Sequence, residues 1–214
     1  MRLYLIRHGQ TAANERGVAQ GHLDEPLDEV GLHQARLLAD HWTAPLDEIW
    51  SSDLTRCRVT AGFLASQTGA PIQIDPRLRE RSFGELEGRA FAEVRARLDT
   101  LAAQAEIPIE AARPEGGEST LDVWNRLDGV LEQIQSSPHR SLAIVSHGGT
   151  CATLLARLIA ATPQTLRSFR FGNTAVTELR RTDHGVFHLV RFAETPHLVE
   201  PSRPMVDDHA PSRS

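Results

Sequence analysis

The chain has 214 residues, of which 40% are hydrophobic and 24% charged, and its formal net charge at pH 7 is −5. This size and composition suit one globular domain with its own core. Proteins that bind nucleic acids non-specifically carry a basic surface, so the acidic balance argues against a nucleic-acid partner. No apolar run approaches the roughly 18–20 residues that cross a bilayer, so we expect no membrane partner.

The apolar run at the N-terminus is interrupted at Arg7 and His8, which makes it too short for a signal peptide. Cys57 and Cys151 are the only cysteines, and their positions form no pattern. We interpret both as small, semi-buried hydrophobic residues of a protein in a reducing compartment. The expected location is therefore the cytoplasm.

In the first part of the chain, strands and helices are predicted to alternate. Short apolar runs predict strands over residues 3–6, 48–51 and 71–74. Apolar residues at helical spacing predict a helix over 31–42, and the polar stretch between 11 and 26 is mostly loop.

The middle of the chain is predicted mainly as helix and loop. Ser52 or Asp53 can cap a helix that follows the second strand. Apolar spacing supports another helix from Phe91 onward, and prolines break the pattern after it. Ser119 follows a glycine-containing loop and is placed as the cap of an amphipathic stripe over 123–134.

Residues 141–145 are apolar without alternation, which is typical of a strand covered on both faces. Two later strands, over 175–179 and 186–190, are joined by the turn 183–185 and predict an antiparallel hairpin at the sheet edge. Strands that alternate with helices predict an α/β fold. We expect a three-layer α/β/α sandwich around a mostly parallel central sheet with an antiparallel edge strand.

We expect residues 1–193 to form a single domain and 194–214, which are rich in Pro, Ser, Asp and Arg, to be an extended C-terminal tail. No internal repeat divides the chain. The apolar stripes of the helices can pack on the sheet or on a second subunit, so a homodimer stays open.

Two predicted strands end in a histidine that is followed by glycine, in Arg7-His8-Gly9 and in Ser146-His147-Gly148. Ligands of α/β proteins bind at the carboxyl ends of strands, and a glycine there lets an anion approach the backbone amides. Arg56 follows a third strand. One histidine at a strand end is more often structural, but two imidazoles and two guanidiniums at one sheet edge have few structural uses and indicate a functional site.

A series of motifs surrounds these residues, in the following order: Arg7-His8-Gly9-Gln10-Thr11 with Asn14, Pro26-Leu27-Asp28 with Gly31, Ser51-Ser52-Asp53-Leu54-Thr55-Arg56, Leu78-Arg79-Glu80 with Glu87-Gly88, Gly116-Gly117-Glu118-Ser119, and Ser146-His147-Gly148-Gly149. The series resembles the histidine phosphatase superfamily, which includes the cofactor-dependent phosphoglycerate mutases. The resemblance covers about residues 2–192 and implies a phosphoglycerate mutase-like fold.

The resemblance implies that His8 is a nucleophile that forms a transient phosphohistidine, and that Glu80 is the general acid and base. Taken alone, Glu80 lies among arginines and reads as a surface ion-pair residue. The catalytic set implied is Arg7, His8, Arg56, Glu80 and His147. The implied substrate-binding set is Arg7, Asn14, Gln20, Gly21, Arg56, His147 and Gly148, and His22 is also expected to face the substrate. Cationic side chains stabilise the phosphoryl charge, so the resemblance implies no cofactor.

His184 and His188 invite a metal interpretation because they are four residues apart. They fall in a predicted turn and strand, where this spacing does not form a helical ligand pair. We therefore expect no metal site.

The superfamily contains phosphatases, mutases and members that have lost activity. The segment 89–115 is expected to cover the substrate, and it is short, moderately apolar and balanced in charge rather than basic. This favours water as the phosphoryl acceptor and predicts a phosphatase that acts on a small-molecule phosphate ester. A phosphoglycerate mutase is the alternative. An inactive phosphate-binding or regulatory module is a minor alternative, because such modules usually lose the nucleophile or the acid.

Overall fold

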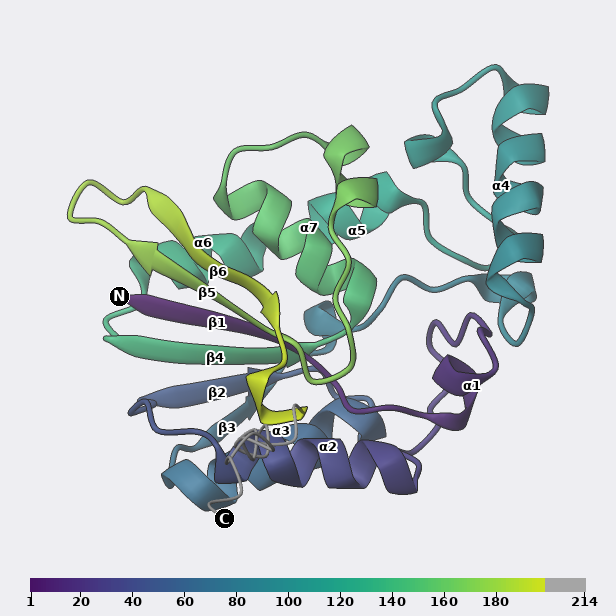
Figure 1. Cartoon of the computed structure of the whole chain (residues 1–214). Helices are drawn as coiled ribbons and strands as arrows, with labels where there is room; N and C mark the ends of the chain where they lie inside the picture. Colours follow the sequence, from purple (N-terminus) through teal and green to yellow (C-terminus); the bar gives the residue numbers. More distant parts are fainter. Residues whose placement is uncertain (199–214) are drawn as a thin grey trace, which may run out of the picture.

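The computed structural model describes residues 1–198, which contain one six-stranded sheet in the order β3-β2-β4-β1-β5-β6 (Figure 1). The strands are β1 (Arg2–Arg7), β2 (Glu48–Ser51), β3 (Ile72–Ile74), β4 (Ser141–Ser146), β5 (Val176–Arg181) and β6 (Phe187–Glu194). The strands β3, β2, β4 and β1 pair in parallel, whereas β5 is antiparallel to β1 and to β6. The predicted parallel sheet with an antiparallel hairpin at its edge is confirmed.

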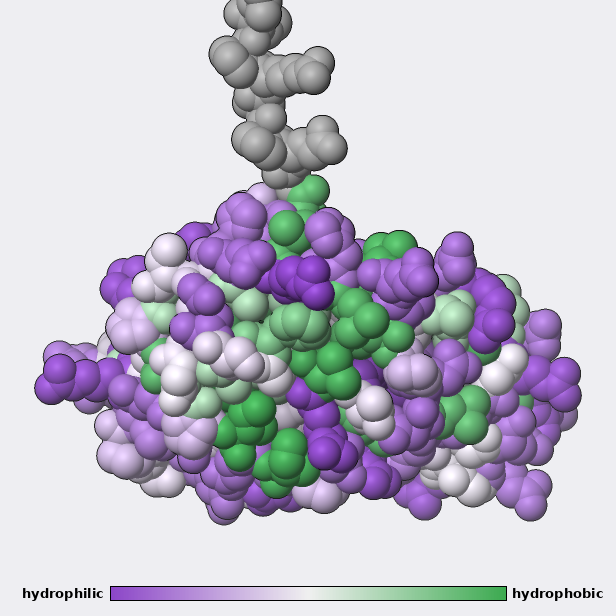
Figure 2. Space-filling view, turned by 90° about the horizontal axis from the view of Figure 1, so that it is seen from below, coloured by the Kyte–Doolittle hydropathy of each residue, from purple (hydrophilic) through white to green (hydrophobic). Residues whose placement is uncertain are grey.

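Helices cover both faces of this sheet. They are α1 (Ala12–Glu15), α2 (Glu29–Asp40), α3 (Thr55–Thr68), α4 (Phe91–Ala105), α5 (Thr120–Arg126), α6 (Asp128–Ser136) and α7 (Gly148–Leu158). Figure 1 shows α2 and α3 on one face and α5, α6 and α7 on the other, while α4 stands beyond the carboxyl ends of the strands. The three predicted layers are therefore present. The outer surface of the α2–α3 layer is largely polar, with a small apolar area near its centre (Figure 2).

The core explains why β4 has an unbroken apolar sequence. Leu142 and Ile144 pack into the cluster under α5, α6 and α7, whereas Ala143 and Val145 pack under α2 and α3. All four residues are fully buried, since a central strand between two helical layers has no face toward water. Burial of a Leu or Ile side chain stabilises a fold by about 1.5–3 kcal/mol.

A separate small cluster holds α4. Val94, Leu98 and Ala102 of this helix pack on Ala19, Phe83 and other residues from the loops at the strand ends, and not on the sheet. We call residues 84–113 the arm, because they include the short 3-10 helices η2 (Gly84–Leu86) and η3 (Ile109–Ala111) on either side of α4. The arm thus lies beside the strand ends with its own core.

Two local predictions were wrong. The stripe over 123–134 is not one helix but two, α5 and α6, which meet at the buried Leu127. Neither Ser52 nor Asp53 caps α3: the carboxylate of Asp24 accepts the Thr55 backbone N–H at 2.7 Å, and Asp53 binds Arg79. The cap comes from a residue 31 positions away, which local sequence does not reveal.

Other local predictions are confirmed or refined. Ser119 caps α5 in a capping box with Asp122. The loop predicted over 11–26 contains the one-turn helix α1. After β6, a 3-10 turn at Pro196–Leu198 buries His197 against Thr174, and the rest of the predicted tail lies outside the described residues.

Within residues 1–198, no helix has both the length and the apolar character that a bilayer crossing requires. Both cysteines are free thiols buried in the core.

The turn after His8 packs directly on α2. A side-chain carbon added at Gly31 would overlap the carbonyl oxygen of Gln10, and one at Gly9 would overlap the carbonyl of Gly31. We predict that Gly31→Ala lowers the free energy of unfolding by about 1–3 kcal/mol, the usual effect of overpacking. Gly62→Ala, in α3 with open space around it, is the control and should be neutral or stabilising by up to about 1 kcal/mol. Urea unfolding measures both, and equal stabilities would contradict the close approach.

Candidate active site

A cavity of about 680 Å³ opens at the carboxyl ends of β1 and β4. All of the residues predicted for the site line it: Arg7, His8, Asn14, Gln20, Gly21, Arg56, Glu80, His147 and Gly148. They come from six separate parts of the chain, and the fold brings them together. His22 is an exception among the expectations, because its ring lies against the Glu80 carbonyl oxygen at 2.9 Å and does not line the cavity.

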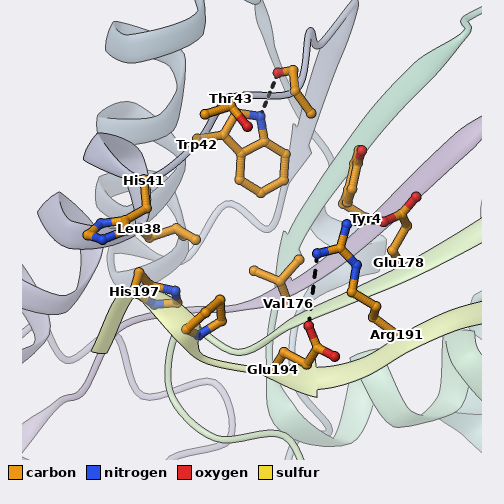
Figure 3. Close-up of a pocket in the computed structure, with 12 residues that line it drawn as sticks. Tyr4, Leu38, His41, Trp42, Thr43, Val176, Glu178, Arg191, Glu194 and His197 are labelled. Carbon is orange, nitrogen blue, oxygen red and sulfur yellow. Dashed lines mark hydrogen bonds and ion pairs between the residues drawn. The ribbon is translucent and has the colours of Figure 1, made fainter. Parts of the chain in front are cut away.

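A second, smaller cavity of about 150 Å³ lies between α2 and the β5–β6 hairpin (Figure 3). Tyr4 and Trp42 meet there edge to face, and Arg191 pairs with the buried Glu178 at 2.9 Å. Its lining includes none of the predicted site residues. The larger cavity is therefore the candidate active site.

His8 follows β1 directly and is 3% exposed. Its backbone N–H donates to Ser146 of β4, which holds the residue at the sheet edge. The ring Nδ1 lies 2.7 Å from the Gly9 carbonyl oxygen, so Nδ1 carries the proton and Nε2 carries the free lone pair. Burial lowers the pKa of His8 well below its usual value, and the charges of Arg7 and Arg56 lower it further. The ring is therefore neutral at pH 7, with the Nε2 lone pair unprotonated.

Arg56, from α3, is 1% exposed and donates to the carbonyl oxygens of Leu23 and Gly21 at 2.7 and 2.8 Å. Arg7 donates to the carbonyl oxygen of Phe171, and its Nε is buried without a partner among residues 1–198. Within the described part of the chain, neither guanidinium forms an ion pair. Burial lowers the pKa of both, but a guanidinium stays charged in proteins. Two unneutralised cations therefore face the cavity.

His147 lies at the N-cap of α7 with its ring centre 5.1 Å from that of His8. Its Nδ1 accepts a hydrogen bond from Arg56 Nε at 3.3 Å, so Nε2 carries the proton and donates to Ser52 at 3.0 Å. Burial and the nearby Arg56 lower the pKa of His147 well below its usual value. Gly148 and Gly149, in the first turn of α7, also line the cavity, and the N-terminus of a helix attracts anions.

Glu80 lies in the loop that follows the 3-10 helix η1 (Pro76–Leu78). The backbone amides of Gly149 and Arg81 each donate to its carboxylate at 2.9 Å. A side-chain carbon at Gly149 would overlap the Glu80 carboxylate as it stands, so the glycine lets the carboxylate lie against the helix end. The carboxylate thus sits at the N-terminus of α7 and lines the cavity.

Sequence analysis missed a residue that holds the Glu80 segment in place. Arg126 of α5 donates to the carbonyl oxygens of Arg77, Arg79 and Glu80, and its Nε and Nη2 also donate to the Glu118 carboxylate at 2.9 and 3.2 Å. Its acceptors are backbone oxygens 46 to 49 residues away, so no local pattern marks it. The motif residue Glu118 therefore supports the Glu80 segment through Arg126.

Two further residues shape the other side of the site. Asn173 donates to the side-chain oxygen of Asn14 at 3.0 Å and to the His8 carbonyl oxygen, which leaves the Asn14 amide nitrogen as a donor. Glu87 accepts the amides of His22 and Phe83, and it leaves no room for a side chain at Gly21, whose φ is +53°. The motif residue Glu87 thus fixes the loop that carries Gln20.

Among residues 1–198, no three or more His, Cys, Asp or Glu side chains are grouped as they would be around a metal ion. His184 lies in the hairpin turn and His188 in β6, as the sequence predicted.

An α/β sandwich with buried neutral histidines, unneutralised guanidiniums and a carboxylate at one sheet edge defines an enzyme that handles phosphate groups. The family model described as the histidine phosphatase superfamily (branch 1) matches residues 3–195, and the chain belongs to this superfamily. It is therefore an enzyme of the phosphatase and mutase type, as the motifs predicted.

Similar proteins include some that are named phosphatases and some that are named phosphoglycerate mutases. A putative phosphoserine phosphatase 2 of Hydrogenobacter thermophilus is 36% identical over 180 residues, which cover 83% of this chain and 88% of that protein. A probable phosphoglycerate mutase of Yersinia pestis is 33% identical over 181 residues, 84% of each chain.

Solved structures agree with the fold. A putative alpha-ribazole-5′-P phosphatase from Escherichia coli superposes with a TM-score of 0.81 at 28% identity, and the match covers 94% of this chain and 99% of that chain. A mycobacterial glucosyl-3-phosphoglycerate phosphatase in complex with VO3 has a TM-score of 0.75 at 33% identity, with 90% and 98% covered.

The buried histidines predict how stability depends on pH. In the unfolded chain His8 takes up a proton near pH 6.5, whereas the lowered pKa keeps it neutral in the folded chain. Below about pH 6.5 the unfolded state binds more protons, so the free energy of unfolding falls as pH falls, by up to about 1.4 kcal/mol per pH unit for each such histidine.

His8→Asn should therefore reduce this loss of stability by about 1 kcal/mol between pH 6.5 and 5.5, where the unfolded histidine goes from half to mostly protonated. Urea unfolding of both proteins in phosphate-free buffer at pH 7.5, 6.5 and 5.5 measures it. Parallel pH dependences of the two proteins would show that His8 is not held neutral.

Proposed function

We propose that the protein is a metal-independent phosphomonoester hydrolase that works through a phosphohistidine at His8. The observation that carries this proposal is the state of the His8 ring: it is buried and neutral, with Nε2 unprotonated. Arg7 and Arg56 stand beside it without an anionic partner among residues 1–198. A phosphate dianion supplies the missing charge, and the phosphorus then lies in front of the nucleophile.

In the first step, the Nε2 lone pair of His8 attacks phosphorus and the bond from phosphorus to the ester oxygen breaks. Glu80, in its protonated form, gives its proton to the leaving oxygen, so the product is a neutral alcohol. Arg7, Arg56 and the Asn14 amide donate to the equatorial oxygens, where the transition state spreads its charge. His147 Nδ1 accepts the hydrogen bond of Arg56 Nε and so orients this guanidinium toward the phosphoryl group.

In the second step, water attacks the phosphohistidine. The Glu80 carboxylate takes a proton from the water, the new phosphorus–oxygen bond forms, and the bond to His8 Nε2 breaks. Inorganic phosphate leaves, and both residues return to their starting protonation states. Arg126 keeps the Glu80 segment at the distance that both proton transfers need.

The acceptor separates a hydrolase from a mutase. Besides Arg7 and Arg56, four arginines line the cavity, and two of them are paired, Arg95 with Asp99 at 2.9 Å and Arg167 with Glu110 at 3.6 Å. This pairing reduces the charge that could hold a doubly charged acceptor, which supports water as the acceptor. The similarity to a probable phosphoglycerate mutase keeps the mutase as the second candidate.

We predict that the purified protein hydrolyses p-nitrophenyl phosphate in the presence of EDTA, and that His8→Ala lowers kcat by at least about 10³-fold because no other group can form the covalent intermediate. Colorimetric release of p-nitrophenol measures it. With 3-phosphoglycerate and 2,3-bisphosphoglycerate, product analysis should find inorganic phosphate and little 2-phosphoglycerate. Activity that EDTA abolishes would refute the metal-independent mechanism, and rapid formation of 2-phosphoglycerate would identify a mutase.

Glu80→Gln tests whether Glu80 is the general acid. The variant keeps the size of the side chain but cannot donate a carboxyl proton to the leaving oxygen. Hydrolysis of alkyl phosphates should therefore slow by about 10²–10⁴-fold, and hydrolysis of aryl phosphates with acidic phenols should slow much less. The ratio of kcat values for the two ester types is the readout. The same factor for both would show that Glu80 does not protonate the leaving group.

A further inference from the structure

We propose that the substrate of this site has a large apolar body, such as an aromatic ring system, attached to its phosphate. This inference rests on the proposed hydrolase function, and it concerns the end of the cavity that the phosphoryl group does not fill. The cavity volume of about 680 Å³ lies within the range of roughly 300–1,000 Å³ that is usual for ligands much larger than phosphate.

Aromatic side chains are scarce in this protein but gather in the cavity. The chain has seven phenylalanines, and four of them line the cavity: Phe83, Phe91, Phe169 and Phe171. Phe91 comes from the arm and Phe83 directly precedes it, whereas Phe169 and Phe171 come from the connection between η4 (Pro163–Ser168) and β5. The aliphatic part of the lining is Val94, Leu98, Ile109, Val123 and Leu166.

One of these rings is unusually open to water. Phe91, at the start of α4, is 51% exposed, although α4 has a cluster of its own into which other residues of the helix pack. A large exposed apolar side chain in a cavity wall marks a binding surface, since burial against an apolar ligand removes it from water. Phe91 touches Phe83 edge to face, with ring centres 6.3 Å apart.

On the opposite wall of the cavity, Phe169 and Phe171 pack against a ring that does not itself line the cavity. Phe192 of β6 packs edge to face on Phe169 at 5.8 Å and on Phe171 at 5.5 Å. These contacts set the positions of both rings before a ligand arrives, which limits the entropy that binding would otherwise cost.

Unlike Arg7 and Arg56, some of the arginines at this end of the cavity already have anionic partners within the chain. Arg95 and Arg167 have carboxylate partners, and Arg81 lies over the ring of Phe83 at 4.6 Å and donates to Thr120. Arg170 also lines the cavity, and within residues 1–198 neither Arg81 nor Arg170 has a carboxylate partner.

Of the nine apolar lining residues named above, five are buried in the protein's own clusters, whereas Phe91 is exposed and Ile109, Leu166 and Phe169 are partly exposed. An ester with an apolar body covers these four side chains, and a small hydrophilic ester such as glycerol phosphate leaves them open to water.

The test compares 3-phenylpropyl phosphate with n-propyl phosphate, because their leaving alcohols have similar acidity and only the body differs. We expect kcat/KM to be about 10- to 100-fold higher for the phenylpropyl ester, the factor that burial of a phenyl ring supplies. Phe91→Ala should reduce this preference by about fivefold or more. Phe63→Ala is the matched control, because Phe63 lies on α3 outside the cavity and the preference should persist.

Equal kcat/KM values for the two esters, or a preference that Phe91→Ala leaves intact, would overturn the inference while the hydrolase function stands. Calorimetric dissociation constants of the two matching phosphonates provide a readout that needs no turnover. If neither ester is hydrolysed, tighter binding of the phenylpropyl phosphonate still supports the apolar body, and only the hydrolase proposal falls. Equal binding in that case would overturn the inference as well.

Discussion

Two guanidinium groups, those of Arg7 and Arg56, are buried at the edge of the sheet and bound to carbonyl oxygens rather than to carboxylates. Burial of an unpaired charge costs several kcal/mol, so most proteins neutralise it. Here the carbonyl oxygens satisfy hydrogen bonds and leave the positive charge in place. Burial, together with this charge, lowers the pKa of His8 and His147, so cations that can attract an anion also keep both rings neutral.

Different parts of the fold form the two ends of the cavity. The end of the cavity at the sheet holds Arg7, His8 and His147, at the carboxyl ends of β1 and β4 and the N-terminus of α7, and Arg56 reaches it from α3. Arg126 and Glu118 extend that rigid frame to the loop that carries Glu80. The other end of the cavity is formed largely by the arm, which has a small core of its own and packs on loops. Under the proposals above, the reaction depends on the residues at the sheet, whereas the preference for one substrate over another depends on the arm and on the connection before β5.

Much of this could be predicted from sequence, and most of the failures share one cause. The apolar run of β4, the His-Gly turns and the Ser119 cap are local signals, and each element lies where it was expected. By contrast, the cap of α3 comes from Asp24, the support of Glu80 comes from Arg126, and the His22 ring turns to a backbone carbonyl. These contacts join residues that are distant in sequence, and many of the acceptors are backbone oxygens, which carry no sequence signal.

The phosphohistidine is the central claim, and it can be observed directly. The enzyme is mixed with a phosphate ester, quenched within milliseconds in alkali, where phosphohistidine survives, and digested for mass spectrometry. The account predicts a phosphoryl group on the peptide that contains Arg7-His8-Gly9, attached to the histidine and lost on acid treatment. A phosphoryl group on another residue, or turnover at full rate with no phosphoenzyme at any time point, would contradict it.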